Sequence, residues 1–339
     1  MTENNRSSQE MGLSTLDERI IHAVQVAPRA PWATLAPVVG ADPVTLARRW
    51  AQLRREGVVY VTGYGGDADS VIALIEIECR PHKTLEVADA LVEERNAFTI
   101  DFTAGARDIM VTLQTQGTTG LADWTLDRVR RLDGIRKVRT HLVSQIVTDA
   151  REWRLRALSK DEVAEIGRRV RPSTATMPRL TPEERRGVLD TLAVDGRAST
   201  AEIAAAAGIS ARKAREAVAA LTSSDRYNVR VDVARARTPW PVSVWYFLQV
   251  SADKLAKVGP LLSRIDEVRL VVTATGEYNV IMAAWLRSLM DVNHLEAVLE
   301  ERLPGVRIVD RSVVLRSLKH LGHVLDDNGD ATGRTVPVP

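Results

Sequence analysis

The chain has 339 residues, a length typical of two or three domains, and 45% hydrophobic with 27% charged residues is an ordinary globular composition. The formal net charge of only +2 excludes a strongly basic domain, so any contact with nucleic acid has to come from local patches. No stretch approaches the roughly 18 apolar residues of a membrane helix, and the N-terminus lacks the features of a secretory signal. We therefore expect a cytoplasmic protein without a membrane partner.

Three helices are predicted at the start of the chain. Apolar residues recur with helical spacing over 16–24, and a short second helix over 32–39 ends at Gly40. Asp42 can then cap a third helix over 43–55, whose first residue is a proline. A short helix, a glycine turn and a capped helix are typical of a helix-turn-helix domain.

An internal repeat shows that this pattern occurs twice. The segment TLAPVVGADPVTLARRWAQL around Gly40 matches EIAAAAGISARKAREAVAAL around Gly208, at an offset of 168 residues. Further along, TAGARD matches TGEYN through Gly105 and Gly276, at an offset of 171 residues. An offset that drifts so little over roughly 100 positions indicates a duplication.

After each set of helices the hydrophobic period changes to that of strands, in the order βαββαβ. The predicted fold class is α+β, with two winged-helix-like helix-turn-helix domains, each followed by a ferredoxin-like βαββαβ domain. The expected divisions are a disordered tail (1–13), helix-turn-helix domain 1 (14–66), ferredoxin-like domain 1 (70–150), a linker (151–179), helix-turn-helix domain 2 (180–237), ferredoxin-like domain 2 (240–320) and a disordered tail (325–339). Within the βαββαβ segments we expect helices at about 83–95, 119–132, 252–264 and 289–302, and part of the linker could be helical.

The third helix carries the strongest signal for function. Its apolar residues Leu46, Trp50 and Leu53 would pack on the first two helices. The opposite face carries Thr45, Arg48, Arg49 and Gln52. Major-groove recognition needs this arrangement, in which side chains that bind bases and phosphates project from a helix fixed by its apolar stripe. We therefore predict binding to double-stranded DNA, although an ordinary solvated helix would show a similar face.

The corresponding helix of the second copy is less suited to DNA. Its outer positions are Lys213, Glu216, Ala217 and Ala220, and Arg212 and Arg215 flank them. The glutamate would repel phosphate, so this helix has either a DNA-binding role through Arg212, Lys213 and Arg215 or a purely structural one.

No enzyme site is evident. The six histidines have no metal-ligand spacing, and nucleophile-elbow, Walker and dinucleotide motifs are absent from the sequence. We expect no catalytic residues, no metal and no cofactor.

The order of motifs resembles the Lrp/AsnC family of feast/famine transcriptional regulators. The resemblance rests on LDERII (16–21), TLAPVVGADPVTLARRWAQLRREGV (34–58) and the turn TGEYN (275–279), which is similar to the G-x-Y-D signature of the family. It implies a homo-oligomeric regulator whose α/β domains pair and bind a small effector, often an amino acid, through loops that include Gly276, Tyr278 and Asn279. The first copy has Arg107 where the tyrosine belongs, so we expect the effector site only in the second copy.

An alternative comes from fused proteins of the same architecture. Sirohaem decarboxylases resemble these regulators but act on a tetrapyrrole, and they carry histidine in an H-x-Y-N version of the turn. This chain has Gly276 at that position, which favours the regulator over a decarboxylase-like enzyme or a DNA-independent small-molecule sensor.

Overall fold

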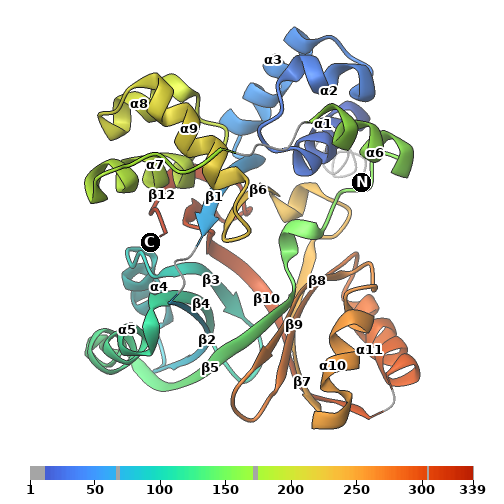
Figure 1. Ribbon diagram of the computed structural model, residues 1–339. Helices are drawn as coiled ribbons and strands as arrows, with labels where there is room; N and C mark the ends of the chain where they lie inside the picture. The colour runs from blue at the N-terminus through green and yellow to red at the C-terminus, as the bar shows by residue number, and fades with distance from the viewer. Residues whose placement is uncertain (1–11, 66–68, 171–174, 304, 339) are drawn as a thin grey trace, which may run out of the picture.

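The structure is a computed structural model that describes residues 12–65, 69–170, 175–303 and 305–338. Two three-helix units lie above a strand-rich body (Figure 1). The first unit contains α1 (Thr15–Val26), α2 (Trp32–Val39) and α3 (Pro43–Arg55). The second contains α7 (Pro182–Val194), α8 (Thr200–Ala207) and α9 (Ala211–Thr222). No helix in the described part of the chain is long and apolar enough to cross a membrane.

The turn chemistry explains where these helices begin and end. Gly40 and Gly208 both adopt left-handed conformations, with φ of 83° and 64°, at the ends of α2 and α8. The Asp42 carboxylate accepts hydrogen bonds from the amides of Val44 and Thr45 and so caps α3. The Ser210 hydroxyl caps α9 in the same way.

The βαββαβ order predicted for the body is present in both copies. The first copy comprises β2 (Ser70–Cys79), α4 (Thr84–Val92), β3 (Ala97–Thr103), β4 (Ile109–Gln116), α5 (Gly117–Asp123) and β5 (Ile135–Thr148). The second comprises β7 (Val242–Val250), α10 (Ala252–Leu262), β8 (Val268–Ala274), β9 (Val280–Leu286), α11 (Met290–Arg302) and β10 (Val306–His320). The helix expected at 119–132 is less regular than predicted, because α5 continues into a π-helical turn at Trp124–Arg128 and a 3₁₀ turn at Val129–Arg131.

The strands of the two copies close into one barrel. Strand β5 pairs first with β2 of its own copy and then with β8 of the other, and β10 pairs with β7 and then with β3. The ring therefore runs β10-β3-β4-β2-β5-β8-β9-β7 and returns to β10. The helices of each copy lie outside it (Figure 1). The two sheets thus pair within one chain.

Two predicted divisions need correction. Residues 325–338 are not a disordered tail, because β11 (His323–Leu325) and β12 (Ala331–Thr335) extend the sheet from β10. The Asp326 side chain forms the turn between them by accepting from the amides of Asn328 and Asp330. Helix α6 (Lys160–Arg169), in the expected linker, packs on the first three-helix unit. Most of the N-terminal tail, residues 1–11, lies outside the described residues, as do residues 171–174 of the linker.

Candidate functional site

The two three-helix units are joined by a reciprocal contact. The Arg29 guanidinium donates to the carbonyl oxygens of Gly196 and Ala198 in the second unit. Arg197, 168 positions later, donates to the carbonyls of Pro28 and Ala30 in the first unit, at 2.5 and 3.0 Å. The same surface of each unit therefore binds the other, as at the interface of a symmetric dimer.

A two-stranded ribbon continues this symmetry. Strand β1 (Val59–Gly65) pairs antiparallel with β6 (Tyr227–Val233), and Thr62 lies opposite Arg230 at the centre of the pairing. These two residues are also 168 positions apart, so the pseudo-twofold axis passes through the ribbon. One chain thus has the symmetry of a dimer.

The predicted DNA-contacting residues of α3 have different environments. Arg48 is exposed, and no described residue forms a hydrogen bond or ion pair with its side chain. The Arg49 guanidinium instead donates two hydrogen bonds to the buried carboxylate of Asp17 on α1, one of them at 2.7 Å. The Gln52 side chain accepts a hydrogen bond from Arg49 at 3.0 Å and donates one to Glu56 at 2.9 Å. Thr45 is half-buried, and its backbone amide donates to the Asp42 cap. Arg49 therefore fixes α3 against α1, a role that its position in the sequence did not reveal.

On α9 the basic side chains are mostly paired. Arg212 contacts Glu216 at 2.8 Å, and Lys213 contacts Glu184 on α7 at 3.3 Å. Arg215 is exposed and has no such partner among the described residues. Arg48 and Arg215 are thus the most available cations of the seven predicted DNA-binding residues.

The turn predicted to bind an effector makes contacts that stabilise the fold. Gly276 has a φ of 116°, a conformation that favours glycine. Both polar atoms of the Asn279 side chain bind the backbone of Val250, with distances of 2.9 and 2.6 Å. Asp108, the matching residue of the first copy, likewise accepts from the Cys79 amide. Because Asn279 is already satisfied, it has little capacity to hold a ligand.

The neighbouring end of the barrel is filled by buried charges. Arg107, whose side chain is 1% exposed, donates to Glu76 at 2.7 Å and to Ser312 at 2.6 Å, and it also contacts Asp310. His141 bonds the other Glu76 oxygen at 2.6 Å. Burial alone would raise the pKa of Glu76, but His141 and Arg107 hold it below its usual value. We call this region, which also contains Tyr278 packed on His141, the closed end.

The opposite end of the barrel opens into a cavity of about 440 Å³, which we call the chamber. The β1–β6 ribbon forms its roof, with Tyr60, Tyr64 and Asp232, and the barrel interior forms its floor, with Leu74, Trp245 and Ala283. A pocket of this size in a barrel mouth, with apolar surface and polar groups that face one cavity, is typical of small-molecule sites.

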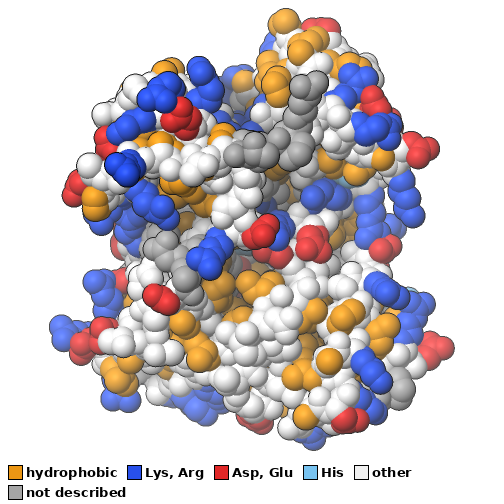
Figure 2. All heavy atoms as spheres, viewed as in Figure 1, with side chains coloured by type: hydrophobic (Ala, Val, Ile, Leu, Met, Phe, Trp, Pro, Cys, Tyr) orange, Lys and Arg blue, Asp and Glu red, His pale blue; other side chains and the backbone are white. Residues whose placement is uncertain are grey.

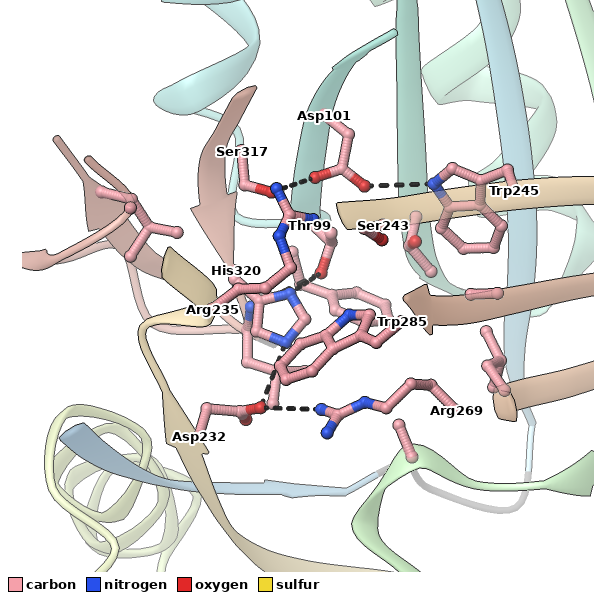
Figure 3. A pocket seen from close by; sticks show the side chains of 18 of the residues that line it. Thr99, Asp101, Asp232, Arg235, Ser243, Trp245, Arg269, Trp285, Ser317 and His320 are labelled. Carbon is pink, nitrogen blue, oxygen red and sulfur yellow. Dashed lines mark hydrogen bonds and ion pairs between the residues drawn. The ribbon is translucent and has the colours of Figure 1, made fainter. Parts of the chain in front are cut away.

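Asp232 is the centre of the charge cluster in the chamber (Figure 3). One of its oxygens lies 2.6 Å from Arg230, 3.5 Å from Arg269 and 3.5 Å from His320. Burial would raise the pKa of Asp232, but the cations beside it hold that pKa well below its usual range. Its other oxygen is buried without a hydrogen-bond partner among the described residues.

Arg269 is the most strongly desolvated cation of the cluster. Its guanidinium lies 3.6 Å from the ring centre of Trp285 and 4.4 Å from that of Trp153. Burial and the neighbouring Arg230 lower the pKa of Arg269 to about 9. The chamber has no signal in the sequence, because its residues come from both copies and share no motif.

Comparison with known proteins assigns the barrel domains. The family model described as the Lrp/AsnC ligand binding domain matches residues 72–153 and again residues 245–324. The chain carries the Lrp/AsnC ligand binding domain. Each of the two matches spans one βαββαβ copy, so the ligand-binding domain of the family is present twice.

Curated relatives correspond to less than half of this chain. An HTH-type transcriptional regulator of Pyrococcus furiosus is 24% identical over 150 residues, which cover 42% of this chain and 95% of the relative. The regulator FL11 of Pyrococcus abyssi is 27% identical over 142 residues, covering 39% of this chain and 90% of the relative. Because the relatives are matched almost completely by less than half of the chain, a second unit of similar size remains.

A solved structure matches the whole two-copy arrangement. The sirohaem decarboxylase NirDL is similar with a TM-score of 0.57 at 15% identity, covering 91% of this chain and 93% of that chain. At this identity the likeness shows that the two proteins share a fold, and no more.

Proposed function

We propose that this chain is a sequence-specific DNA-binding transcriptional regulator controlled by a small-molecule effector, and that α1–α3 and α7–α9 are its two helix-turn-helix domains. The observation that carries the proposal is the reciprocal contact of Arg29 and Arg197 about the pseudo-twofold axis. Regulators that bind paired half-sites present two recognition helices related by a twofold axis. Here a single chain supplies both, and its curated relatives are HTH-type transcriptional regulators.

The charge distribution supports binding through a few specific contacts. On the face seen in Figure 2, Lys and Arg side chains are dispersed over both three-helix units and interspersed with acidic ones. A net charge of +2 fits this picture. Arg48 on α3 and Arg215 on α9 are the side chains best placed to bind bases or phosphates, because no internal ion pair would have to break.

Selection of duplexes from a random pool, followed by anisotropy titrations at fixed salt, tests the proposal. We expect Arg48→Ala to weaken binding to the selected duplex by about 1–3 kcal/mol without lowering the free energy of unfolding. Arg49→Ala is expected to lower that free energy, because it leaves the Asp17 carboxylate buried and unpaired. Arg131→Ala, which changes an exposed arginine on the barrel domain, is the matched control.

The result that would contradict the proposal is equally clear. If no duplex is enriched, or if the selected and scrambled duplexes bind equally at the same salt concentration, the chain does not bind DNA in a sequence-specific way. Equal losses for Arg48→Ala and Arg131→Ala would remove α3 from the interface.

The effector of this regulator, proposed to be a small molecule such as an amino acid, requires a site. Gly276, Tyr278 and Asn279 remain a prediction for it, although the Asn279 amide is occupied by Val250 and Tyr278 is only 7% exposed. Homo-oligomerisation also remains a prediction, since the pairing of the two sheets is satisfied within the chain.

A decarboxylase-like enzyme is the second candidate, because the likeness to NirDL extends over nearly the whole chain. The imidazole of His141 is also close to Gly276, where a Cβ atom would lie 3.2 Å from its Nδ1. Absorbance titration with sirohaem distinguishes the two proposals. A shifted Soret band and loss of carbon dioxide from the substrate would favour the enzyme, and neither is expected for the regulator.

A further inference from the structure

The chamber contains one guanidinium without a partner. Arg235 follows the ribbon in a short 3₁₀ turn, lines the chamber and points into it (Figure 3). No described residue forms a hydrogen bond or ion pair with its side chain, and burial lowers its pKa despite the nearby Asp101. Leaving a desolvated guanidinium without an acceptor is unfavourable, so this position is suited to an anion from outside the chain.

The acidic residues around it make their contacts with other groups. The two Asp101 oxygens are already engaged, one by Ser317 at 2.7 Å and the other by the indole of Trp245 at 3.2 Å. Asp232 is shared by Arg230, Arg269 and His320. The remaining pair, Arg316 with Asp327 at 2.7 Å, lies at the rim, where the Asp327 side chain is 81% exposed. The described lining contains as many aspartates as arginines, but Arg235 is the one arginine among these residues that forms no hydrogen bond or ion pair with any of them.

The walls limit the body of such an anion. Trp245 and Trp285 present indole rings, and Leu74, Val272 and Ala283 add apolar surface between them. Aromatic and aliphatic walls favour a flat apolar group, and carboxylates are the natural partners of a guanidinium. The volume of about 440 Å³ accommodates a ligand of one or two fused rings but excludes a macromolecule.

We propose that the chamber binds a carboxylate carried on a flat apolar body, with Arg235 as its anion-binding residue, and that this ligand is the effector. The regulatory part rests on the proposed function. A ligand in the chamber would touch both the ribbon that joins the two three-helix units and the interior of the barrel. Its binding energy would therefore depend on how the units sit on the barrel, which is the requirement for coupling to DNA.

Fluorescence titration with 1-anilinonaphthalene-8-sulfonate, a flat aromatic anion, tests the binding site. We expect one probe per chain, displaced by indole-3-acetate, whereas the uncharged indole-3-acetamide should compete at least about tenfold less well. Arg235→Gln should weaken the probe about tenfold or more, and Ala283→Phe should exclude it by filling the chamber. Arg237→Gln is the matched control, because Arg237 lies two residues along the same turn but binds Asp330 instead.

Several results would overturn the proposal. These are absence of probe binding, equal affinity in wild type and Arg235→Gln, and equal competition by the acid and its amide. DNA binding tests the proposed function independently of the ligand, because Arg235→Gln without ligand should bind the selected duplex as the wild type does. If the wild type binds no duplex but still binds the probe, the proposed regulatory function is wrong, whereas the proposed binding site in the chamber is supported.

Discussion

An arginine lies at each end of the barrel, but the two arginines have different environments. At the closed end, the buried Arg107 contacts Glu76, Ser312 and Asp310. At the chamber end, Arg235 faces a cavity without a partner among the described residues. Counting acceptors therefore distinguishes Arg107, a buried arginine with internal partners, from Arg235, a partly buried arginine that we propose to bind a ligand.

Both copies contribute equivalent positions to each end of the barrel, and these positions have diverged. At the closed end, Glu76, Arg107 and His141 of the first copy correspond, 171 positions later, to Phe247, Tyr278 and Ser312. The two sets pack against each other, with charge from one copy and rings from the other. At the chamber end, Phe98 corresponds to Arg269, and here the cavity persists. Because both copies contribute equivalent positions to each end, the pseudo-twofold axis does not exchange the two ends, and divergence of the copies makes each end asymmetric.

The largest predicted effect separates the two arginines. Arg107→Met should lower the free energy of unfolding by about 3–5 kcal/mol, because it breaks a buried ion pair and leaves the buried Glu76 carboxylate with only His141 and the more distant Arg139 as partners. Arg235→Gln should change it by less than about 1 kcal/mol, since no internal partner is lost. Urea unfolding monitored by tryptophan fluorescence measures both. A larger loss for Arg235→Gln than for Arg107→Met would reverse the comparison.

A smaller effect is expected at the turn beside the closed end. Gly276→Ala should destabilise the protein by about 1–2 kcal/mol, because its φ of 116° is strained for any other residue and the new Cβ would press on His141. Gly167→Ala is the control, since Gly167 lies in α6 with nothing within 4 Å of a new Cβ, and it should stabilise by about 0.5–1 kcal/mol. Thermal unfolding of the two variants decides the matter, and no loss in Gly276→Ala would show that the closed end is not tightly packed.

The smallest change is expected where the barrel is hollow. Ala283→Phe should alter the free energy of unfolding by less than about 1 kcal/mol, because the added ring enters the chamber. Ala284→Phe on the same strand points into the packed core beneath the helices and should cost about 1–3 kcal/mol. Similar losses in both variants, measured by urea unfolding, would mean that the chamber is too small to accept a ring.

Much of the fold could be predicted from local sequence signals. The repeat, the glycine turns and the Asp42 cap predicted the helices, and the period of the apolar residues predicted the strands. Closure of the barrel could not be predicted, because β5 and β10 each change partner midway and no local signal marks that change. The polar composition of residues 325–339 concealed a hairpin held by Asp326 and Asp330.

The site was harder to predict for a physical reason. Arg49 appeared to face DNA because helical spacing gives only the face of a residue, and the Asp17 carboxylate that holds it lies on another helix. The chamber combines Asp101, Asp232 and Arg269 from three separate strands, so only the folded chain brings them together. Asn279 was expected to bind a ligand, but its side chain binds the backbone of Val250, as the matched Asp108 binds the backbone of Cys79 in the other copy.

Hydrogen–deuterium exchange with and without 1-anilinonaphthalene-8-sulfonate tests most directly which end of the barrel binds a ligand. With the probe at saturation, we predict slower amide exchange in the roof of the chamber, at residues 60–64 and 230–235, and unchanged exchange at the turns 105–108 and 275–279. Protection at 275–279 without protection of the roof would contradict the assignment and place the ligand at the end of the barrel that we describe as closed.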